Sequence, residues 1–285
     1  MNNLVYCVYG DKCAREALFS IMSAIRLEGL PAKDWRLLIY TDDPRPFARF
    51  DAAIERLDEQ RLKDWAGSAN FGHRRKICVL RHAISNYGRS VLVDSDTYFL
   101  RPPRRLFEKV SPGNAIMHMR EALLRRFAYL TPLLESLCAE PFEVQGWVYK
   151  FTRDWLMWNS GIVGLDPADE SLVERVIMLT DAIHQRSPSL LSEQIAFTVA
   201  FKESTNLREA DEIVYHYWPA DLREQFQSVL RGLLEHFATA DIGLLTERLY
   251  ELRPRPKLKR RVKARAKEIL FKAGWKSVGV RSSGL

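Results

Sequence analysis

The feature that most constrains the fold is an alternation of strand-like and helix-like segments, which starts at the first residues and continues through most of the chain. Short runs rich in β-branched and aromatic residues predict strands at residues 4–9, 36–40, 52–57, 90–93, 115–119, 161–165 and 212–215. Apolar residues at helical spacing predict helices at residues 14–28, 71–87, 171–185, 191–202 and 220–252, the last in two segments. Because strands that alternate with helices form parallel sheets covered on both faces, we predict an α/β fold with a mixed, mainly parallel sheet flanked by helices.

Acidic residues follow three of the predicted strands. Asp11 follows the first, Asp42 follows the second, and an Asp-Ser-Asp sequence (residues 94–96) follows the apolar run at 90–93. Sheets of this kind bind ligands beyond the carboxyl ends of their strands. Residues two apart in an extended segment project to the same side, so Asp94 and Asp96 can share one hard cation. Such an ion can clamp a diphosphate and neutralise a departing nucleoside diphosphate. The alternative is a turn whose two acids cap the next helix.

The segment around these acids resembles a known enzyme family. VLVDSDTYFL (91–100) is similar to the DxD segment of GT-A glycosyltransferases, especially family 8. In the same order, WNSGIVGL (158–165) resembles the family's FN[AS]GVLLIN stretch, SEQ (192–194) its Asp-Gln helix start, and YHY (215–217) the strand whose histidine completes the metal site. The resemblance covers about residues 4–218. It implies a GT-A fold that transfers a sugar from a nucleotide-diphosphate sugar, UDP-sugar by default, with retention of configuration.

The resemblance assigns roles to individual residues. A metal site for Mn²⁺ or Mg²⁺ would comprise Asp94, Asp96 and His216, a nitrogen and oxygen donor set that suits these ions better than zinc. Nucleotide-sugar contacts are expected from Tyr9, Asp11, Asp42, Arg75, Lys76, Asp94 and Ser95. Catalytic contacts to the transferred sugar are expected from Asn159, Glu193 and Gln194. The alternatives for these residues are structural: a histidine in an aromatic cluster, a solvated basic helix start, and polar caps.

The acceptor is expected to be a glycan or a lipid-linked molecule, and Trp147, Trp155 and Trp158 form either an acceptor wall or core packing. The chain departs from the family where HYWPADLRE (216–224) replaces a segment like HxxGxxKPW, and where Glu193 replaces a shorter acid. Two other functions therefore stay open. One is a catalytically inactive GT-A-like binding or adaptor protein. The other is a haloacid-dehalogenase-type phosphatase, although Thr97 follows Asp96 directly, unlike the DxDxT motif of that class.

The positive charge is concentrated in the C-terminal segment. The chain carries a net charge of +7, but residues 253–285 hold twelve Lys or Arg against one acid, Glu268, which leaves −4 for the other 252 residues. We predict a catalytic domain at 1–252 and a basic amphipathic helical tail at 253–285, suited to an anionic membrane surface. A charged helix packed on the body and a nucleic-acid tail are the alternatives. No nucleic-acid partner is expected.

The cysteines and the apolar runs bear on the compartment. The four cysteines contain no CxxC pair, which favours reduced thiols over a disulfide or zinc site. No run approaches the roughly 18–20 apolar residues needed to span a bilayer, and we expect no secretory signal. The expected location is cytoplasmic, peripheral on the inner face of the membrane.

Overall fold

The computed structural model describes residues 1–29, 32–144 and 146–255. The chain divides into two compact units, Met1–Glu251 and Leu252–Leu285. Only the first four residues of the second unit are described. The predicted helical tail at 253–285 therefore lies almost entirely outside the described residues, and both that helix and the domain boundary stay predictions.

A seven-stranded sheet forms the centre of the first unit, in the order β10-β6-β9-β4-β1-β2-β3. Its strands are β1 (Asn2–Val8), β2 (Trp35–Thr41), β3 (Ala52–Arg56), β4 (Ser90–Val93), β6 (Asn114–Leu123), β9 (Leu156–Leu165) and β10 (Asn206–Glu209). The pairs β1–β2, β1–β4, β2–β3 and β6–β10 are parallel, whereas β9 pairs antiparallel with both β4 and β6. The predicted mixed, mainly parallel sheet is thus confirmed.

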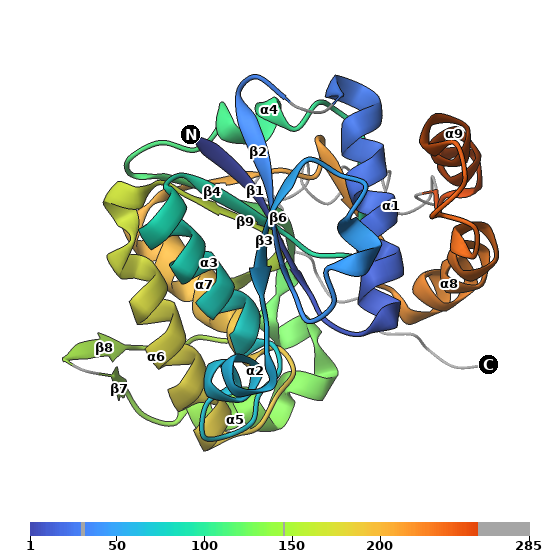
Figure 1. The fold of residues 1–285 in the computed structure, drawn as a ribbon. Helices are drawn as coiled ribbons and strands as arrows, with labels where there is room; N and C mark the ends of the chain where they lie inside the picture. Colours follow the sequence, from blue (N-terminus) through green and yellow to red (C-terminus); the bar gives the residue numbers. More distant parts are fainter. Residues whose placement is uncertain (30–31, 145, 256–285) are drawn as a thin grey trace, which may run out of the picture. The chain divides into compact units, whose positions relative to one another are not determined.

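Helices cover both faces of this sheet, as predicted (Figure 1). The helices α3 (Arg74–Tyr87), α6 (Ser171–Arg186) and α7 (Ser192–Ser204) cover one face, and their apolar sides share a buried cluster with Val5, Leu92 and Val163 of the sheet. The helix α1 (Asp11–Glu28) covers the other face, with α8 (Ala220–Leu234) and α9 (Ile242–Leu252) outside it. Helices on both faces bury the apolar strands, which explains why their sequences are continuously apolar.

Shorter elements complete the described chain. The helices are α2 (Glu59–Ala66), α4 (Arg104–Phe107) and α5 (Thr131–Cys138), and single 3₁₀ turns occur at Arg45–Phe47, Leu124–Arg126, Ala128–Leu130 and Pro167–Asp169. Two small antiparallel sheets pair β5 (Thr97–Phe99) with β11 (Val214–His216), and β7 (Phe142–Val144) with β8 (Trp147–Tyr149). The sequence patterns did not predict α2, α4, α5, β5, β7, β8 or β10, because short elements carry little periodicity. The strand β9 starts five residues earlier than predicted, so that Asn159 lies inside it.

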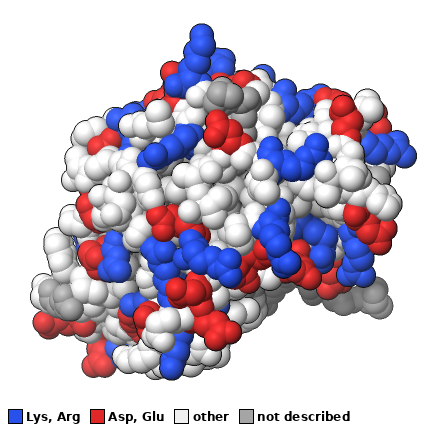
Figure 2. All heavy atoms as spheres, in the orientation of Figure 1, with Lys and Arg blue, Asp and Glu red and all other residues white. Residues whose placement is uncertain are grey.

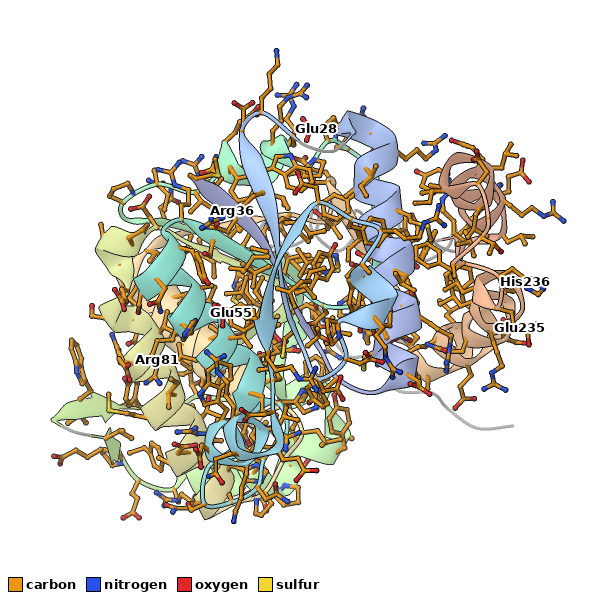
Figure 3. All side chains as sticks on the ribbon, in the orientation of Figure 1. Glu28, Arg36, Glu55, Arg81, Glu235 and His236 are labelled. Carbon is orange, nitrogen blue, oxygen red and sulfur yellow. The ribbon has the colours of Figure 1, made fainter. Side chains whose placement is uncertain are left out.

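The edge of the sheet at β3 carries charged side chains. Glu55 of β3 accepts hydrogen bonds from Arg61 (3.1 Å) and Tyr87, and the guanidinium of Arg36 on β2 lies 4.7 Å from the ring centre of Tyr87 (Figure 3). Charges on an edge strand hinder pairing with another chain. Basic and acidic side chains are interspersed on the face shown in Figure 2. None of the helices in the described residues is both long and apolar enough to cross a membrane.

Candidate functional site

Three sheet strands bring polar residues to one edge. Asp94 follows the last residue of β4, and its backbone N–H donates to the carbonyl of Gly161 on β9 at 2.8 Å. Because β9 runs antiparallel to β4, its first half, with Asn159 and Ser160, lies at the edge where β4 ends. The pairing of β6 with β9 shifts register on either side of the Met119–Asn159 pair. Such bulges re-aim side chains next to functional sites.

His216 reaches this edge from a distant part of the chain. Its strand, β11, pairs antiparallel with β5, which continues directly from the Asp-Ser-Asp sequence, and His216 lies opposite Thr97. The backbone N–H of Tyr217 donates to the carbonyl of Asp96 at 3.0 Å. This ladder places the histidine beside acids that precede it by about 120 residues.

One ligand atom from each of Asp94, Asp96 and His216 lies within 4.8 Å of the others. The side chains of Asp96 and His216 are 7% and 6% exposed, whereas that of Asp94 is 27% exposed, so the group opens to solvent at Asp94. Nε2 of His216 lies 3.2 Å from Oδ1 of Asp96. The geometry therefore gathers the three residues that the sequence selected as metal ligands.

Each of the two aspartates has its own basic partner. Nζ of Lys76, in the first turn of α3, lies 3.2 Å from Oδ1 of Asp94, and it also donates to the carbonyl of Ser160 at 3.0 Å. NH1 of Arg223, in the first turn of α8, lies 3.3 Å from Oδ2 of Asp96. The segment after His216 has no lysine at the position where the family has one, but the guanidinium of Arg223 from the same segment lies beside Asp96.

A buried glutamate anchors each of these basic groups. Oε1 of Glu193, at the start of α7, lies 3.1 Å from Nζ of Lys76, and its side chain is 2% exposed. Glu16 of α1 is fully buried and accepts two hydrogen bonds from Arg223, at 2.7 and 2.5 Å. Bidentate pairs of this kind hold a guanidinium in one orientation. Glu16 and Arg223 were not predicted as site residues, because neither lies in a motif.

The charge balance of this cluster suits a divalent cation. Four carboxylates, those of Asp94, Asp96, Glu16 and Glu193, face two basic side chains, Lys76 and Arg223. In ionised form they leave two negative charges uncompensated, at the point where two carboxylates and an imidazole converge. Oxygen and nitrogen donors in this number fit Mn²⁺ or Mg²⁺. The residues present therefore fit the ion that the sequence predicted.

The pKa values reflect these contacts. Burial opposes ionisation of Asp96, but the charge and hydrogen bond of His216 and the charge of Arg223 outweigh it and hold the pKa of Asp96 well below its usual range. Burial likewise opposes the charged form of Lys76, yet Asp94 and Glu193 raise its pKa above the ordinary value. Burial raises the pKa of Glu193, and Lys76 offsets part of that rise. Lys76 is therefore positively charged in the site.

Asn159 and Gln194 share a partner that the sequence analysis missed. Glu121 of β6 accepts from Nδ2 of Asn159 at 2.9 Å through one oxygen and from Nε2 of Gln194 at 3.0 Å through the other. Burial raises the pKa of Glu121, and the two hydrogen bonds offset part of the rise. Glu121 lies where the β6–β9 register shifts, between Arg120 and Leu123. No sequence signal marks such a bulge.

His118, also on β6, was missed as well. It is 2% exposed, its Nε2 donates to the carbonyl of Val214 at 3.1 Å, and its ring centre lies 5.4 Å from that of His216. Burial, together with the nearby charge of His216, lowers the pKa of His118 to about 3. His118 is therefore neutral and packs behind the candidate metal ligand.

The expected nucleotide contacts lie at the ends of β1 and β2. The carboxylate of Asp42 accepts from the backbone N–H of Gly10 at 3.1 Å, which ties the two strand ends together. The guanidinium of Arg75 lies 5.1 Å from the ring centre of Tyr9, and burial raises the pKa of the Tyr9 phenol. Asp11 is exposed at the start of α1. Asp42, Tyr9 and Arg75 are thus engaged with protein groups here.

Ser95 lies between the two aspartates and faces a different neighbour. Its hydroxyl donates to Oε2 of Glu16 at 3.3 Å, and the residue is 8% exposed. It therefore helps to orient the glutamate that holds Arg223, a structural contact beside the role expected for it toward the nucleotide-sugar.

The predicted tryptophan wall is only partly exposed. Trp158 is 8% exposed in β9, and Trp155 packs on Phe151, with ring centres 5.1 Å apart. Trp147 is 53% exposed on β8, where the guanidinium of the buried Arg175 lies 4.1 Å from its ring centre. A fourth tryptophan, Trp218, was not singled out from the sequence. It is 41% exposed, and its ring centre lies 5.0 Å from that of His216.

Two surface cavities lie elsewhere on the described chain. One, of about 380 Å³, is lined by Lys12, Arg15, Glu224, Gln227, Ser228 and Arg231 of α1 and α8. The other, of about 500 Å³, is lined by Asp43, Arg45, Pro46, Ala48, Arg49, Phe237 and Ala238. Neither cavity is lined by Asp94, Asp96 or His216.

No protein-family model and no curated protein sequence matches the chain. Among solved structures, it is similar to mouse xyloside xylosyltransferase 1 in its apo form, with 16% identity and a TM-score of 0.47 over 74% of this chain and 85% of that chain. It is also similar to the apo structure of the bifunctional glycosyltransferase WbbM, with 11% identity and a TM-score of 0.46 over 72% of this chain and 38% of that chain.

Proposed function

We propose that this protein is a metal-dependent glycosyltransferase of the GT-A type, which transfers a sugar from a nucleotide-diphosphate sugar, UDP-sugar by default, to a saccharide or lipid-linked acceptor. The observation that carries the proposal is the convergence of Asp94, Asp96 and His216 at the carboxyl edge of the sheet, with a basic side chain on each acid. Ligands bind at this edge in sheets of this kind. A cation site flanked by two basic groups suits a diphosphate better than a neutral substrate.

The residues of this chain have separable roles in the proposal. Asp94, Asp96 and His216 hold the cation, Mn²⁺ or Mg²⁺. When bound, the ion would supply positive charge that stabilises the departing nucleoside diphosphate. Lys76 and Arg223 add fixed positive charge on either side of the acids, and the buried glutamates keep both groups from turning away. Preorganised charges of this kind stabilise a leaving group without reorganisation during the reaction.

In this proposal the acceptor substrate binds at the solvent-exposed part of the cluster, near Asp94 and Trp218. Asp94 is the most exposed of the three ligands, and Trp218 presents an exposed indole beside His216. Aromatic faces pack against the apolar faces of sugar rings, so Trp218 is a better candidate for a saccharide contact than the buried Trp158. Retention of configuration and a peripheral position at the inner face of a membrane, through residues 253–285, belong to the proposal as well.

A donor screen tests this function. The full chain is incubated with nucleotide-sugars and Mn²⁺, and release of nucleoside diphosphate is followed with and without a chelator. Metal-dependent release is expected, and Asp94→Asn is expected to abolish it while circular dichroism shows an unchanged fold. Release that persists undiminished in Asp94→Asn would contradict the assigned metal role. Mn²⁺ and UDP that do not bind at all would instead favour the inactive adaptor.

A further inference from the structure

The amide of Asn159 can take only one orientation. Its Oδ1 accepts the backbone N–H of Gly161 at 2.9 Å, and its Nδ2 lies 2.9 Å from a carboxylate oxygen of Glu121. A backbone N–H can only donate, and a carboxylate oxygen that contacts an amide nitrogen accepts. Exchanging the oxygen and the nitrogen of this amide would break both hydrogen bonds. The oxygen of Asn159 therefore faces His216.

This orientation determines which nitrogen of His216 carries a proton. Nδ1 lies 2.9 Å from Oδ1 of Asn159, so Nδ1 must donate. In the neutral imidazole, the proton on Nδ1 leaves a lone pair on Nε2. Nε2 is then the ring nitrogen left to bind a metal ion, and it lies 3.2 Å from Oδ1 of Asp96, another of the proposed ligands. Outer partners that orient a ligating imidazole in this way are common in metal sites.

We propose that Glu121 and Asn159 are positioning residues that hold His216 in the tautomer with Nδ1 protonated and Nε2 free to bind a divalent cation. This rests on the proposed function only for the identity of the ion. It also gives Asn159 a role different from the sugar contact expected from the sequence. The second oxygen of Glu121 accepts from Gln194, so the same carboxylate couples the start of α7 to the histidine.

Exchanging the carboxylate of Glu121 and the amide of Asn159 tests the hydrogen-bonded chain Glu121–Asn159–His216, called the relay below. Asn159→Asp places a carboxylate against Glu121, and the two repel. In the double variant with Glu121→Gln, the introduced amide can donate to the introduced carboxylate, while its oxygen still accepts from Gln194. Asn159→Leu removes the acceptor for Nδ1 altogether. Thr198→Val is a matched control, because Thr198 is 2% exposed and accepts from the backbone of neighbouring Trp158 without touching the relay.

Mn²⁺ binding to the full chain is measured by calorimetry for each variant. We expect Asn159→Leu to weaken Mn²⁺ binding by about 10- to 100-fold, the usual effect of losing such an outer partner. Asn159→Asp should weaken it less, because the introduced carboxylate still offers Nδ1 an acceptor although Glu121 repels it. The double variant should recover most of that loss, and Thr198→Val should bind like the wild type. Wild-type affinity in both Asn159 variants, or no recovery in the double variant, would overturn the proposal.

A second measurement needs no metal. Nitrogen-15 NMR of the histidine side chains, with His216 assigned from its own substitution, reports which ring nitrogen is protonated in the metal-free protein. The wild type should carry a proton on Nδ1, and Asn159→Leu should lose it. If Nδ1 of His216 carries no proton in the wild type, the relay is overturned, whatever the metal affinity of the protein. Failure of the wild type to bind Mn²⁺ and UDP would count against the proposed function instead, since the NMR result stands apart from it.

Discussion

The imidazole of His216 lies directly against the backbone of Gly161. A Cβ atom added at residue 161 would stand 2.1 Å from Nδ1 of His216, far inside the closest approach of real atoms. Gly161, the first glycine of the WNSGIVGL segment, is therefore required because the side chain of His216 on β11 occupies the space of a Cβ atom. This contact joins two segments that the sequence identified separately and explains why one of them needs a residue without a side chain.

The first prediction concerns that contact. Gly161→Ala is expected to push His216 out of reach of Asp96 and to weaken Mn²⁺ binding by at least about tenfold, the scale seen when a metal ligand loses its support. Calorimetry with Mn²⁺ measures the loss. Gly232→Ala is the control, since an added Cβ there meets nothing within 4 Å. Equal affinity in the two variants would show that His216 is not a ligand.

The second prediction concerns the guanidinium on α8. Arg223→Gln is expected to weaken UDP binding in the presence of Mn²⁺ by about tenfold or more, because a hydrogen bond to a charged group contributes roughly 1.5–3 kcal/mol. Affinity for uridine, which has no phosphate, should not change. Arg231→Gln, on the same helix, serves as the control. A parallel loss of uridine and UDP affinity in Arg223→Gln would point to a disturbed fold rather than to a phosphate contact.

The third prediction concerns Glu16, which acts on phosphate only through Arg223. Glu16→Gln keeps the shape of the side chain but replaces one acceptor oxygen with a donor, so one of the two hydrogen bonds to Arg223 is lost. UDP affinity with Mn²⁺ should fall less than in Arg223→Gln. In the double variant, the effect of Glu16→Gln should largely disappear, because residues that act as a unit are not additive. Additive losses of UDP affinity in the double variant would show that Glu16 does not act through Arg223.

The fourth prediction concerns pH and His118. Burial lowers its pKa from the ordinary 6.5 to about 3. Between these pH values the unfolded chain binds the proton that the folded chain excludes, so the free energy of unfolding falls as the pH falls, by up to about 1.4 kcal/mol per pH unit. Urea unfolding of the metal-free protein from about pH 7 to about pH 5 measures this slope. His118→Gln should flatten it.

An exposed histidine provides the comparison for that experiment. His236, labelled in Figure 3, is exposed in the segment that links α8 to α9. His236→Gln should therefore leave the pH slope as it is in the wild type. Identical slopes for the wild type and His118→Gln would mean that His118 takes up its proton in the folded protein as readily as in the unfolded chain.

The fifth prediction concerns the basic segment at 253–285. If it binds anionic lipid as an amphipathic helix, the full chain should sediment with phosphatidylserine vesicles at low salt, because each basic residue near such a surface contributes about 1 kcal/mol. A chain that ends at Leu252 should stay in the supernatant. Added salt should release the full chain through screening. Equal sedimentation of the two chains would exclude a membrane role for this segment.

The sequence by itself determined the features that depend on neighbours along the chain. Strand and helix periodicity gave the mainly parallel sheet, because side chains alternate every two residues in a strand and every 3.6 in a helix. The apolar run that ends at Val93 placed Asp94 and Asp96 at the ligand edge, since carboxyl ends of parallel strands share one side. His216 and Lys76 were selected instead because their segments resemble those of a glycosyltransferase family.

Only the tertiary structure decided which partners those residues have. Glu16 and Arg223 are 207 residues apart, and Glu121 meets Asn159 and Gln194 through a shift in strand register that leaves no pattern in the sequence. Local periodicity says which face a residue occupies, but not which distant side chain packs against it. The charges and hydrogen bonds that tune the site depend on such distant contacts, and helix packing and strand bulges create them.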